Sequence, residues 1–136
     1  MASPTNDKSM IHETAEVSVS ASIGDRVKIG AGAVIHFDAV IGDDVVIGDD
    51  VVIEPASRID VRTRIGAGCT IGRNSEIGSD VKLGRHVLLG NDCYVGDRCI
   101  IGDESRLSID VCLESDVTLG SKCIVCDHVE VWARST

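Results

Sequence analysis

Residues 39–50 read Ala-Val-Ile-Gly-Asp-Asp-Val-Val-Ile-Gly-Asp-Asp, which is one six-residue unit written twice with a single change. The same pattern continues along the chain on both sides of this segment. Every sixth residue from Ile11 to Val131 is aliphatic, in 21 positions without an insertion. The residue two places earlier is always Ser, Thr, Ala, Val or Cys, and Gly follows directly in 12 of the 21 units. A fixed short period of this kind is typical of stacked repeat proteins.

The spacing within the unit predicts its local structure. The small and the aliphatic residue are two positions apart, so an extended strand places both on one face. Ile and Val, which fill most of the aliphatic positions, favour strands over helices. We therefore expect each unit to be a short strand with both residues pointing inward, followed by a corner. We interpret the glycine after the aliphatic residue as supplying unusual backbone angles at that corner.

The repeat over residues 9–132 resembles the hexapeptide-repeat family, the left-handed parallel β-helix of bacterial acyltransferases. The resemblance implies that three units form one triangular coil of 18 residues. It predicts an all-β, single-stranded, left-handed parallel β-helix (a β-solenoid) of about seven coils, stacked ~4.8 Å apart. Residues 1–8 and 133–136 would be an N-terminal tail or cap and a C-terminal tail.

One column of charges supports the 18-residue coil. Residues 18 positions apart become vertical neighbours in such a coil, and in this column the sign alternates from Arg26 onward. We expect each charge to lie between opposite charges, in a solvated ladder whose exposed pairs contribute little. The column consists of Lys8, Arg26, Asp44, Arg62, Asp80, Arg98, Asp116 and Arg134.

Composition excludes several classes of partner. The chain has 136 residues, 13 Lys and Arg against 22 Asp and Glu, and a net charge of −9. An acidic surface does not favour nucleic acid, and with 2% aromatic residues there is no base-stacking platform. The sequence contains no run of 18 apolar residues, so no membrane span is expected. The polar segment from Met1 to Met10 does not resemble a signal peptide, which predicts a cytoplasmic protein.

The outward mid-strand residues differ between the three predicted faces. One face is more apolar than the others, and exposed apolar stripes mark interfaces. Members of the family are usually trimers packed face to face around a threefold axis. The resemblance therefore implies a homotrimer formed through the face that carries Val34, Val52, Thr70 and Leu88.

The histidines provide the candidates for acid–base chemistry. The 18-residue period places Ser18, His36 and Glu54 at successive levels of one corner. Because a carboxylate beside a histidine can orient it and raise its basicity, we take His36 as the candidate general base and Glu54 as its partner. His86, with Glu104 one coil further on, is the second candidate.

A second resemblance concerns chemistry. UDP-N-acetylglucosamine acyltransferases and sugar N-acetyltransferases contain a His-Asp-Cys-x-(Ile/Val)-Gly segment whose histidine is the general base. The matching segment here, residues 91–96, reads Asn-Asp-Cys-Tyr-Val-Gly. Asn91 occupies the position of the base and cannot accept a proton near neutral pH. The chain also lacks the inserted loops that hold donor and acceptor in those relatives.

The resemblance nevertheless implies transfer of an acyl group from acyl-CoA to a sugar or amine. Arg64 and Lys82, one coil apart, are the candidate ligands for the CoA phosphates. A second hypothesis stays open, in which the protein is a non-catalytic β-solenoid scaffold or assembly module, natural or engineered. The unbroken repeat favours it, and some eukaryotic dynactin subunits look similar.

The six cysteines do not suggest a metal centre. Cys69, Cys93 and Cys99 occupy the small inward position, which predicts buried, reduced thiols. Cys123 does as well, and with Cys126 it forms a lone CxxC motif close to His128. A single CxxC is weak evidence for zinc, and here one thiol would point inward while the other lies at a corner. No metal is expected.

Overall fold

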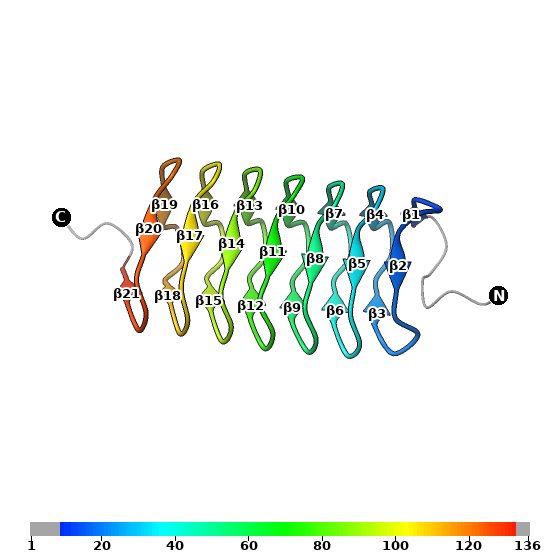
Figure 1. Ribbon diagram of the computed structural model, residues 1–136, viewed down its shortest axis with the longest axis horizontal. Coiled ribbons are helices and arrows are strands. Elements are labelled where there is room, and N and C mark those ends of the chain that lie inside the picture. Colours follow the sequence, from blue (N-terminus) through cyan, green and yellow to red (C-terminus); the bar gives the residue numbers. More distant parts are fainter. Residues whose placement is uncertain (1–8, 133–136) are drawn as a thin grey trace.

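The computed structural model describes residues 9–132, which consist of short strands and turns with no helix. Each of the 21 strands contains two residues, the first pointing outward and the second, aliphatic, pointing inward. The strands form three parallel sheets of seven, so the chain is a β-solenoid of seven turns of 18 residues (Figure 1). The predicted all-β solenoid is confirmed. β1 and β21 lie at opposite ends of its long axis.

The three sheets are named A, B and C in the order in which the chain visits them. Sheet A contains β1 (Met10–Ile11), β4 (Lys28–Ile29), β7 (Val46–Ile47), β10 (Arg64–Ile65), β13 (Lys82–Leu83), β16 (Ile100–Ile101) and β19 (Thr118–Leu119). Sheet B contains β2 (Glu16–Val17), β5 (Val34–Ile35), β8 (Val52–Ile53), β11 (Thr70–Ile71), β14 (Leu88–Leu89), β17 (Arg106–Leu107) and β20 (Ile124–Val125). Sheet C contains β3 (Ser22–Ile23), β6 (Val40–Ile41), β9 (Arg58–Ile59), β12 (Glu76–Ile77), β15 (Tyr94–Val95), β18 (Cys112–Leu113) and β21 (Glu130–Val131).

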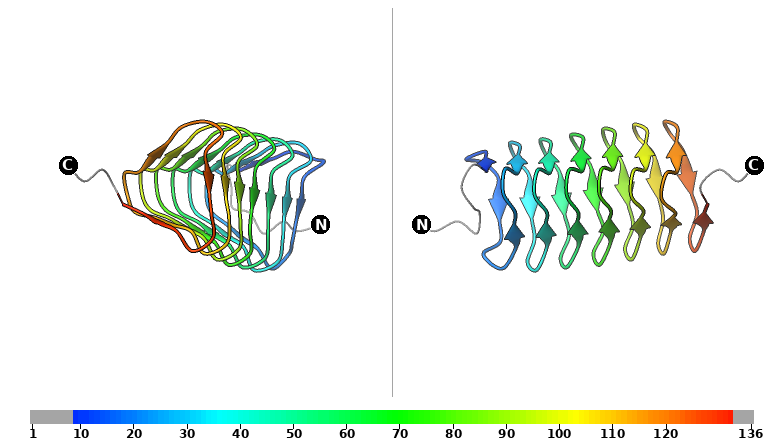
Figure 2. Two further views of the ribbon diagram at one scale, coloured as in Figure 1. Left: turned by 60° about the vertical axis from the view of Figure 1, so that its left-hand side comes forward. Right: turned by 180° about the vertical axis from the view of Figure 1, so that it is seen from behind.

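The register of the sheets is the one that the 18-residue period predicts. Arg64 pairs with Lys82 in sheet A, and Val34 pairs with Val52 in sheet B. Viewed obliquely, successive coils lie over one another with their corners aligned (Figure 2). A residue and its neighbour 18 positions further on are therefore in lateral contact throughout the described chain.

The core is a continuous aliphatic column inside the coils. The aliphatic residues of the central coils are buried, as Ile53 and Leu113 illustrate with no exposed surface. The small inward position also accepts hydroxyls, because each finds a backbone partner in the next coil. The Ser75 hydroxyl, for example, donates to the Gly90 carbonyl at 2.9 Å and accepts from the Cys93 N–H at 3.1 Å. No buried side-chain polar atom of the described residues lacks a partner.

The glycine that follows the aliphatic residue has a different role from the one expected. The left-handed backbone lies two residues later, at the third position after the aliphatic residue, and Gly32 and Gly68 occupy that position in two corners. Elsewhere it is filled by sixteen non-glycine residues, of which seven are Asp and one is Asn. Aspartate and asparagine tolerate this conformation best among residues with a side chain.

Close packing between coils explains the glycine that directly follows the aliphatic residue. A Cβ on Gly66 would lie 2.5 Å from the carbonyl oxygen of Gly84, one coil further on. A Cβ on Gly96 would lie 2.5 Å from the backbone nitrogen of Ser115. The prediction of unusual backbone angles at these glycines was therefore wrong. At Gly66 and Gly96 the corners of adjacent coils approach too closely for a side chain, whereas residues such as His36 and Glu54 occupy the same position in other units.

Carboxylates join the corners of successive coils. The Asp43 carboxylate accepts a hydrogen bond from the Asp25 N–H at 2.8 Å, and the Asp103 carboxylate accepts one from the Arg85 N–H at 2.8 Å. Each carboxylate satisfies a backbone donor that the turn leaves unpaired. This explains why Asp recurs directly after Ile-Gly in the sequence.

The charge column forms separate pairs rather than a continuous ladder. Each arginine makes two hydrogen bonds to the aspartate 18 residues later, with Nε to Oδ1 distances of 2.8–2.9 Å. The other two contacts in the described column, Asp44 with Arg62 and Asp80 with Arg98, carry no hydrogen bond. Lys8 and Arg134 lie outside the described residues. The pairs are Arg26–Asp44, Arg62–Asp80 and Arg98–Asp116.

These pairs shift the pKa of the aspartates. The hydrogen bonds from Arg26 hold the pKa of Asp44 below its usual value, and Arg62 adds a smaller electrostatic effect in the same direction. Both side chains remain exposed, so the contribution of each pair to stability is small. Within residues 9–132, no helix is long and apolar enough to cross a membrane.

Candidate functional site

The corner between sheets B and C carries the favoured catalytic candidates. The His36 N–H donates to the Ile53 carbonyl at 3.0 Å, and the Glu54 N–H donates to the Ile71 carbonyl at 2.9 Å. Ser18, His36 and Glu54 therefore lie at successive levels of one corner, as the sequence predicted. His36 is partly buried and, with the exposed Phe37, borders a shallow hollow beside sheet B.

His36 and Glu54 occupy adjacent levels of the corner, but their side chains are not bonded to each other. Among the described residues, neither side chain makes a hydrogen bond or an ion pair with the other. The backbone therefore brings an imidazole and a carboxylate to adjacent levels without a bond between them. Their assignment as base and orienting partner stays a prediction.

His86 lies at the corner between sheets A and B. It has a left-handed backbone with φ of 57°, and its ring covers Gly68, the residue one coil earlier. This packing holds the imidazole against the corner. In the described part of the chain, no hydrogen bond or ion pair joins His86 to Glu104.

His128 makes the one histidine–carboxylate contact among residues 9–132. Its Nδ1 lies 3.1 Å from Oδ2 of Asp110, and both side chains are exposed. Asp110 and His128 are vertical neighbours that both occupy the left-handed position of their corners. The 18-residue spacing relates the two residues, so the signal for this pair was present in the sequence.

Asn91 has a structural role in its corner. Its side-chain oxygen accepts a hydrogen bond from the Arg73 N–H at 3.0 Å. The Asp43 and Asp97 carboxylates make the equivalent contact at other levels. The residue that stands where relatives are expected to have a catalytic histidine thus links two coils.

The candidate CoA ligands lie on sheet A. Arg64 and Lys82 are register partners on β10 and β13. They border a groove together with Lys28 and the pairs Arg26–Asp44 and Arg62–Asp80. Because the aspartates neutralise Arg26 and Arg62, the remaining positive charge of the groove comes from three residues. We call Lys28, Arg64 and Lys82 the basic row.

The proposed interface face is sheet B. The side chains of Val34, Val52 and Thr70 are partly buried within the single chain, and Leu88 is 42% exposed. Ile124 continues the stripe with 74% exposure, beyond the interruption at Arg106. Apolar side chains also occur on the outer surfaces of the other sheets, including Ile100 on sheet A and Tyr94 on sheet C.

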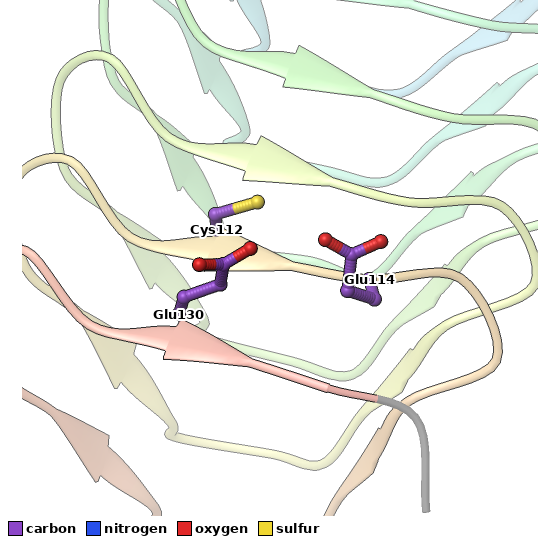
Figure 3. Close-up of side chains that lie close together, drawn as sticks. All are labelled: Cys112, Glu114 and Glu130. Atoms are coloured by element: carbon purple, nitrogen blue, oxygen red, sulfur yellow. The ribbon is translucent and has the colours of Figure 1, made fainter.

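Sheet C carries two features that the sequence analysis did not identify. A groove is bordered by Arg58, Glu76 and Tyr94, from strands β9, β12 and β15. Further along the same sheet, Cys112, Glu114 and Glu130 lie close together (Figure 3). The 18-residue period already relates Cys112 to Glu130, so the signal for this second cluster was present in the sequence.

The cysteines are free thiols, and three of them belong to the core. Burial raises the pKa of the Cys69, Cys93 and Cys99 thiols. Each donates to a carbonyl of the next coil, as Cys93 does to Ser108 at 2.9 Å. The predicted role of these residues as buried core thiols is confirmed, while Cys123 is only partly buried.

Comparison with protein families gives one match. The model described as bacterial transferase hexapeptide (six repeats) matches residues 20–55 and 62–97, which together make up more than half of the chain. The protein is a β-solenoid of the hexapeptide class. The chain belongs to the bacterial transferase hexapeptide family. A comparison with curated proteins gives no match.

Solved structures share the fold. A putative acetyltransferase from Desulfovibrio desulfuricans is 18% identical with a TM-score of 0.76, and the alignment covers 94% of this chain but 27% of that one. Perosamine N-acetyltransferase from Caulobacter crescentus, solved with CoA and GDP-perosamine, is 26% identical with a TM-score of 0.52, covering 90% of this chain and 50% of that one. AntD, an N-acyltransferase from Bacillus cereus solved with dTDP and CoA, is 16% identical with a TM-score of 0.63, covering 91% and 76%. The chain thus spans half or less of the first two of these structures.

Proposed function

We propose that the protein transfers an acyl group from acyl-CoA to a hydroxyl or amine, with a sugar or small amine as acceptor. Membership of the hexapeptide transferase family is the observation that carries this proposal. The likeness to perosamine N-acetyltransferase, solved with CoA and a nucleotide sugar, supports the choice of donor and acceptor.

The proposed active form is a homotrimer that buries sheet B. In one chain, His36 lies at the corner between sheets B and C, whereas the basic row lies on sheet A. A closed threefold ring joins non-equivalent edges of neighbouring copies. With sheet B facing the axis, the B–C corner of one protomer approaches the A–B corner of the next. His36 of one protomer would then share a cleft with Arg64 and Lys82 of its neighbour.

The levels of these residues suit an extended donor. His36 belongs to the coil of β4 and β5, and Arg64 lies on β10, two strands further along sheet A than β4. Two coil spacings correspond to about 10 Å along the solenoid axis. A CoA molecule lying along the cleft could place its phosphates on Arg64 and Lys82 and its thioester near His36.

The residues then have distinct roles. His36 accepts the proton of the acceptor hydroxyl or amine as it attacks the thioester, and Glu54 orients the ring. Arg64 and Lys82 form charge-assisted contacts with the CoA phosphates. Backbone N–H groups at the cleft stabilise the oxyanion.

Substitution of the proposed base tests the mechanism. His36→Ala should lower acetyl-CoA-dependent transfer by ~10²–10⁴-fold, the usual contribution of a general base. The fold and the trimer should not change, which circular dichroism and light scattering can check. His86→Ala is the matched control and should retain activity. An unchanged rate in His36→Ala, with a loss in His86→Ala, would transfer the role to His86.

The oligomeric state tests the interface separately. Val52→Asp combined with Leu88→Asp places charge on sheet B and should give a smaller species by light scattering, because burying unpaired carboxylates is costly. Val40→Asp combined with Tyr94→Asp makes the same change on sheet C and should leave the trimer intact. A wild-type protein that is monomeric at micromolar concentration would contradict the proposal.

The scaffold hypothesis has two structural observations in its favour. The described solenoid has no inserted loop, and its grooves on sheets A and C are open surface features. A thermal-shift titration with acetyl-CoA distinguishes the two functions. Stabilisation that is lost in a variant with Arg64→Ala and Lys82→Ala supports the transferase. The absence of both stabilisation and transfer to a panel of sugars and amines would favour the scaffold hypothesis.

A further inference from the structure

Three potential metal ligands converge on the outer surface of sheet C, close to its C-terminal end. Cys112 and Glu114 lie on either side of the inward-pointing Leu113, so the alternation of side chains directs both outward. Glu130 on β21 is the register partner of Cys112 on β18. Figure 3 shows the thiol and the two carboxylates on one side of these strands.

The spacing of the three donor atoms is close to that of a coordinated ion. One ligand atom from each residue lies within 4.8 Å of the other two. In a tetrahedral zinc site with bonds of about 2.0–2.3 Å, neighbouring ligand atoms are about 3.5 Å apart. Side-chain rotations that move the ligand atoms by roughly an ångström would therefore bring all three within bonding distance of one ion.

The backbone beneath these residues is held in place by the sheet. The Cys112 N–H donates to the Val129 carbonyl at 2.9 Å, and the Glu114 N–H donates to the Val131 carbonyl at 2.9 Å. The positions of the three Cα atoms are thus set by regular strand pairing. A ligand set on paired strands is more precise than one on a loop.

The electrostatics of the cluster favour a cation. Cys112 and Glu114 are partly buried and Glu130 is exposed. A divalent cation at this position stabilises the thiolate and offsets the charge of both carboxylates.

We propose that Cys112, Glu114 and Glu130 bind one divalent cation of the zinc class, with solvent in the fourth position. On binding, the Cys112 thiol loses its proton to the solvent, sulfur and two carboxylate oxygens bond to the metal, and no group changes oxidation state. The sulfur ligand selects against Mg²⁺ and Ca²⁺, which prefer oxygen alone. The site lies outside the residues matched by the family model and does not depend on acyl transfer.

The cysteine motif singled out from the sequence does not form this site. Cys123 points inward and is partly buried, whereas Cys126 is exposed at a corner. His128 pairs with Asp110 instead. Within residues 9–132, the Cys112 cluster is the one group of three such side chains that meets the spacing. Cys126 is therefore a matched control, since it is an accessible thiol without converging carboxylates.

Titration of the reduced protein with Cd²⁺ and Zn²⁺ tests the site. Cd²⁺ should produce a sulfur-to-metal charge-transfer band at one equivalent, and Zn²⁺ should compete for it with release of one proton. Cys112→Ser should abolish the band, and Glu130→Gln should weaken Zn²⁺ binding by about tenfold or more in calorimetry. Cys126→Ser should change neither.

Three results would overturn the proposal. They are a band that survives in Cys112→Ser, a band that is lost in Cys126→Ser, and Zn²⁺ affinity in Glu130→Gln equal to that of the wild type. Glu130 is exposed, so its substitution leaves the core intact and the outcome does not depend on the folding of the cysteine variant.

Discussion

The inward and outward residues of the same strands behave in opposite ways. On β6, Ile41 is 2% exposed and has an aliphatic equivalent in every coil, whereas Val40 is 38% exposed and its register partner is Arg58. The interior repeats because every coil must fill the same triangular space and join the same neighbours. The exterior varies because nothing in the stacking constrains it. The signal for the fold is therefore repeated in every coil, whereas the residues of a binding or catalytic site occur once.

The largest expected effect is the difference in stability between a substitution at an inward residue and one at the adjacent outward residue. Ile41→Ala should lower the free energy of unfolding by about 2–5 kcal/mol, because it leaves a cavity in a continuous core. Val40→Ala, on the neighbouring residue, should cost less than about 1 kcal/mol. Urea denaturation followed by circular dichroism measures both. Equal losses in the two variants would contradict the contrast between interior and exterior.

The corner glycines test whether coil-to-coil contact is the limiting constraint. Gly66→Ala should destabilise the protein by about 3 kcal/mol, since the new Cβ meets the backbone of Gly84 and Arg85 rather than a side chain that can move. Gly120 occupies the same column in the last coil and has no atom within 4 Å of a Cβ position. Gly120→Ala should therefore be nearly neutral in the same denaturation experiment. Destabilisation by Gly120→Ala that matches Gly66→Ala would show that backbone angle, not contact, is the cause.

A smaller effect is expected from the buried hydroxyls. Ser75→Ala leaves the Cys93 N–H and the Gly90 carbonyl without their partner and should cost about 1–2 kcal/mol. Ser22→Ala removes a hydroxyl from an exposed outward position on β3 and should change the unfolding free energy very little. Thermal unfolding of the two variants side by side makes the comparison. A neutral Ser75→Ala would mean that the interior does not depend on these cross-coil bonds.

The smallest effect belongs to the exposed ion pairs and is visible in the pH dependence. The pair with Arg98 lowers the pKa of Asp116 from its ordinary value of 3.8 in the folded protein. Asp116 therefore binds a proton less tightly in the folded protein than in the unfolded chain. The pair stabilises the fold at pH values above the ordinary pKa, and this stabilisation is lost as the pH falls through the lowered pKa. Arg98→Gln should melt slightly earlier than the wild type at pH 7. The two proteins should converge at a pH well below 3.8, and a difference that persists there would contradict this account.

Parts of the candidate site were predictable from the sequence, and others were not. The placement of His36 beside Glu54 and of Arg64 beside Lys82 follows from the 18-residue coil that the family resemblance implied. The contacts that the side chains make do not follow, because rotamers and local turn geometry decide them. His128 reaches Asp110, for example, whereas His36 makes no bond to Glu54. To predict the convergence of Cys112, Glu114 and Glu130, one must combine the alternation of side chains along a strand with the register between strands.

By itself, the sequence determined the repeat, the all-β class and the direction in which the strand side chains point, while the family resemblance supplied the neighbour that each residue has 18 positions away. This was possible because the six-residue pattern is repeated 21 times, so that no single substitution hides the pattern. Only the tertiary structure decided why glycine follows the aliphatic residue and where the backbone turns left-handed. It also decided which charges form pairs and which ligands converge. These features depend on distances between coils, and such distances arise only when one coil lies on the next.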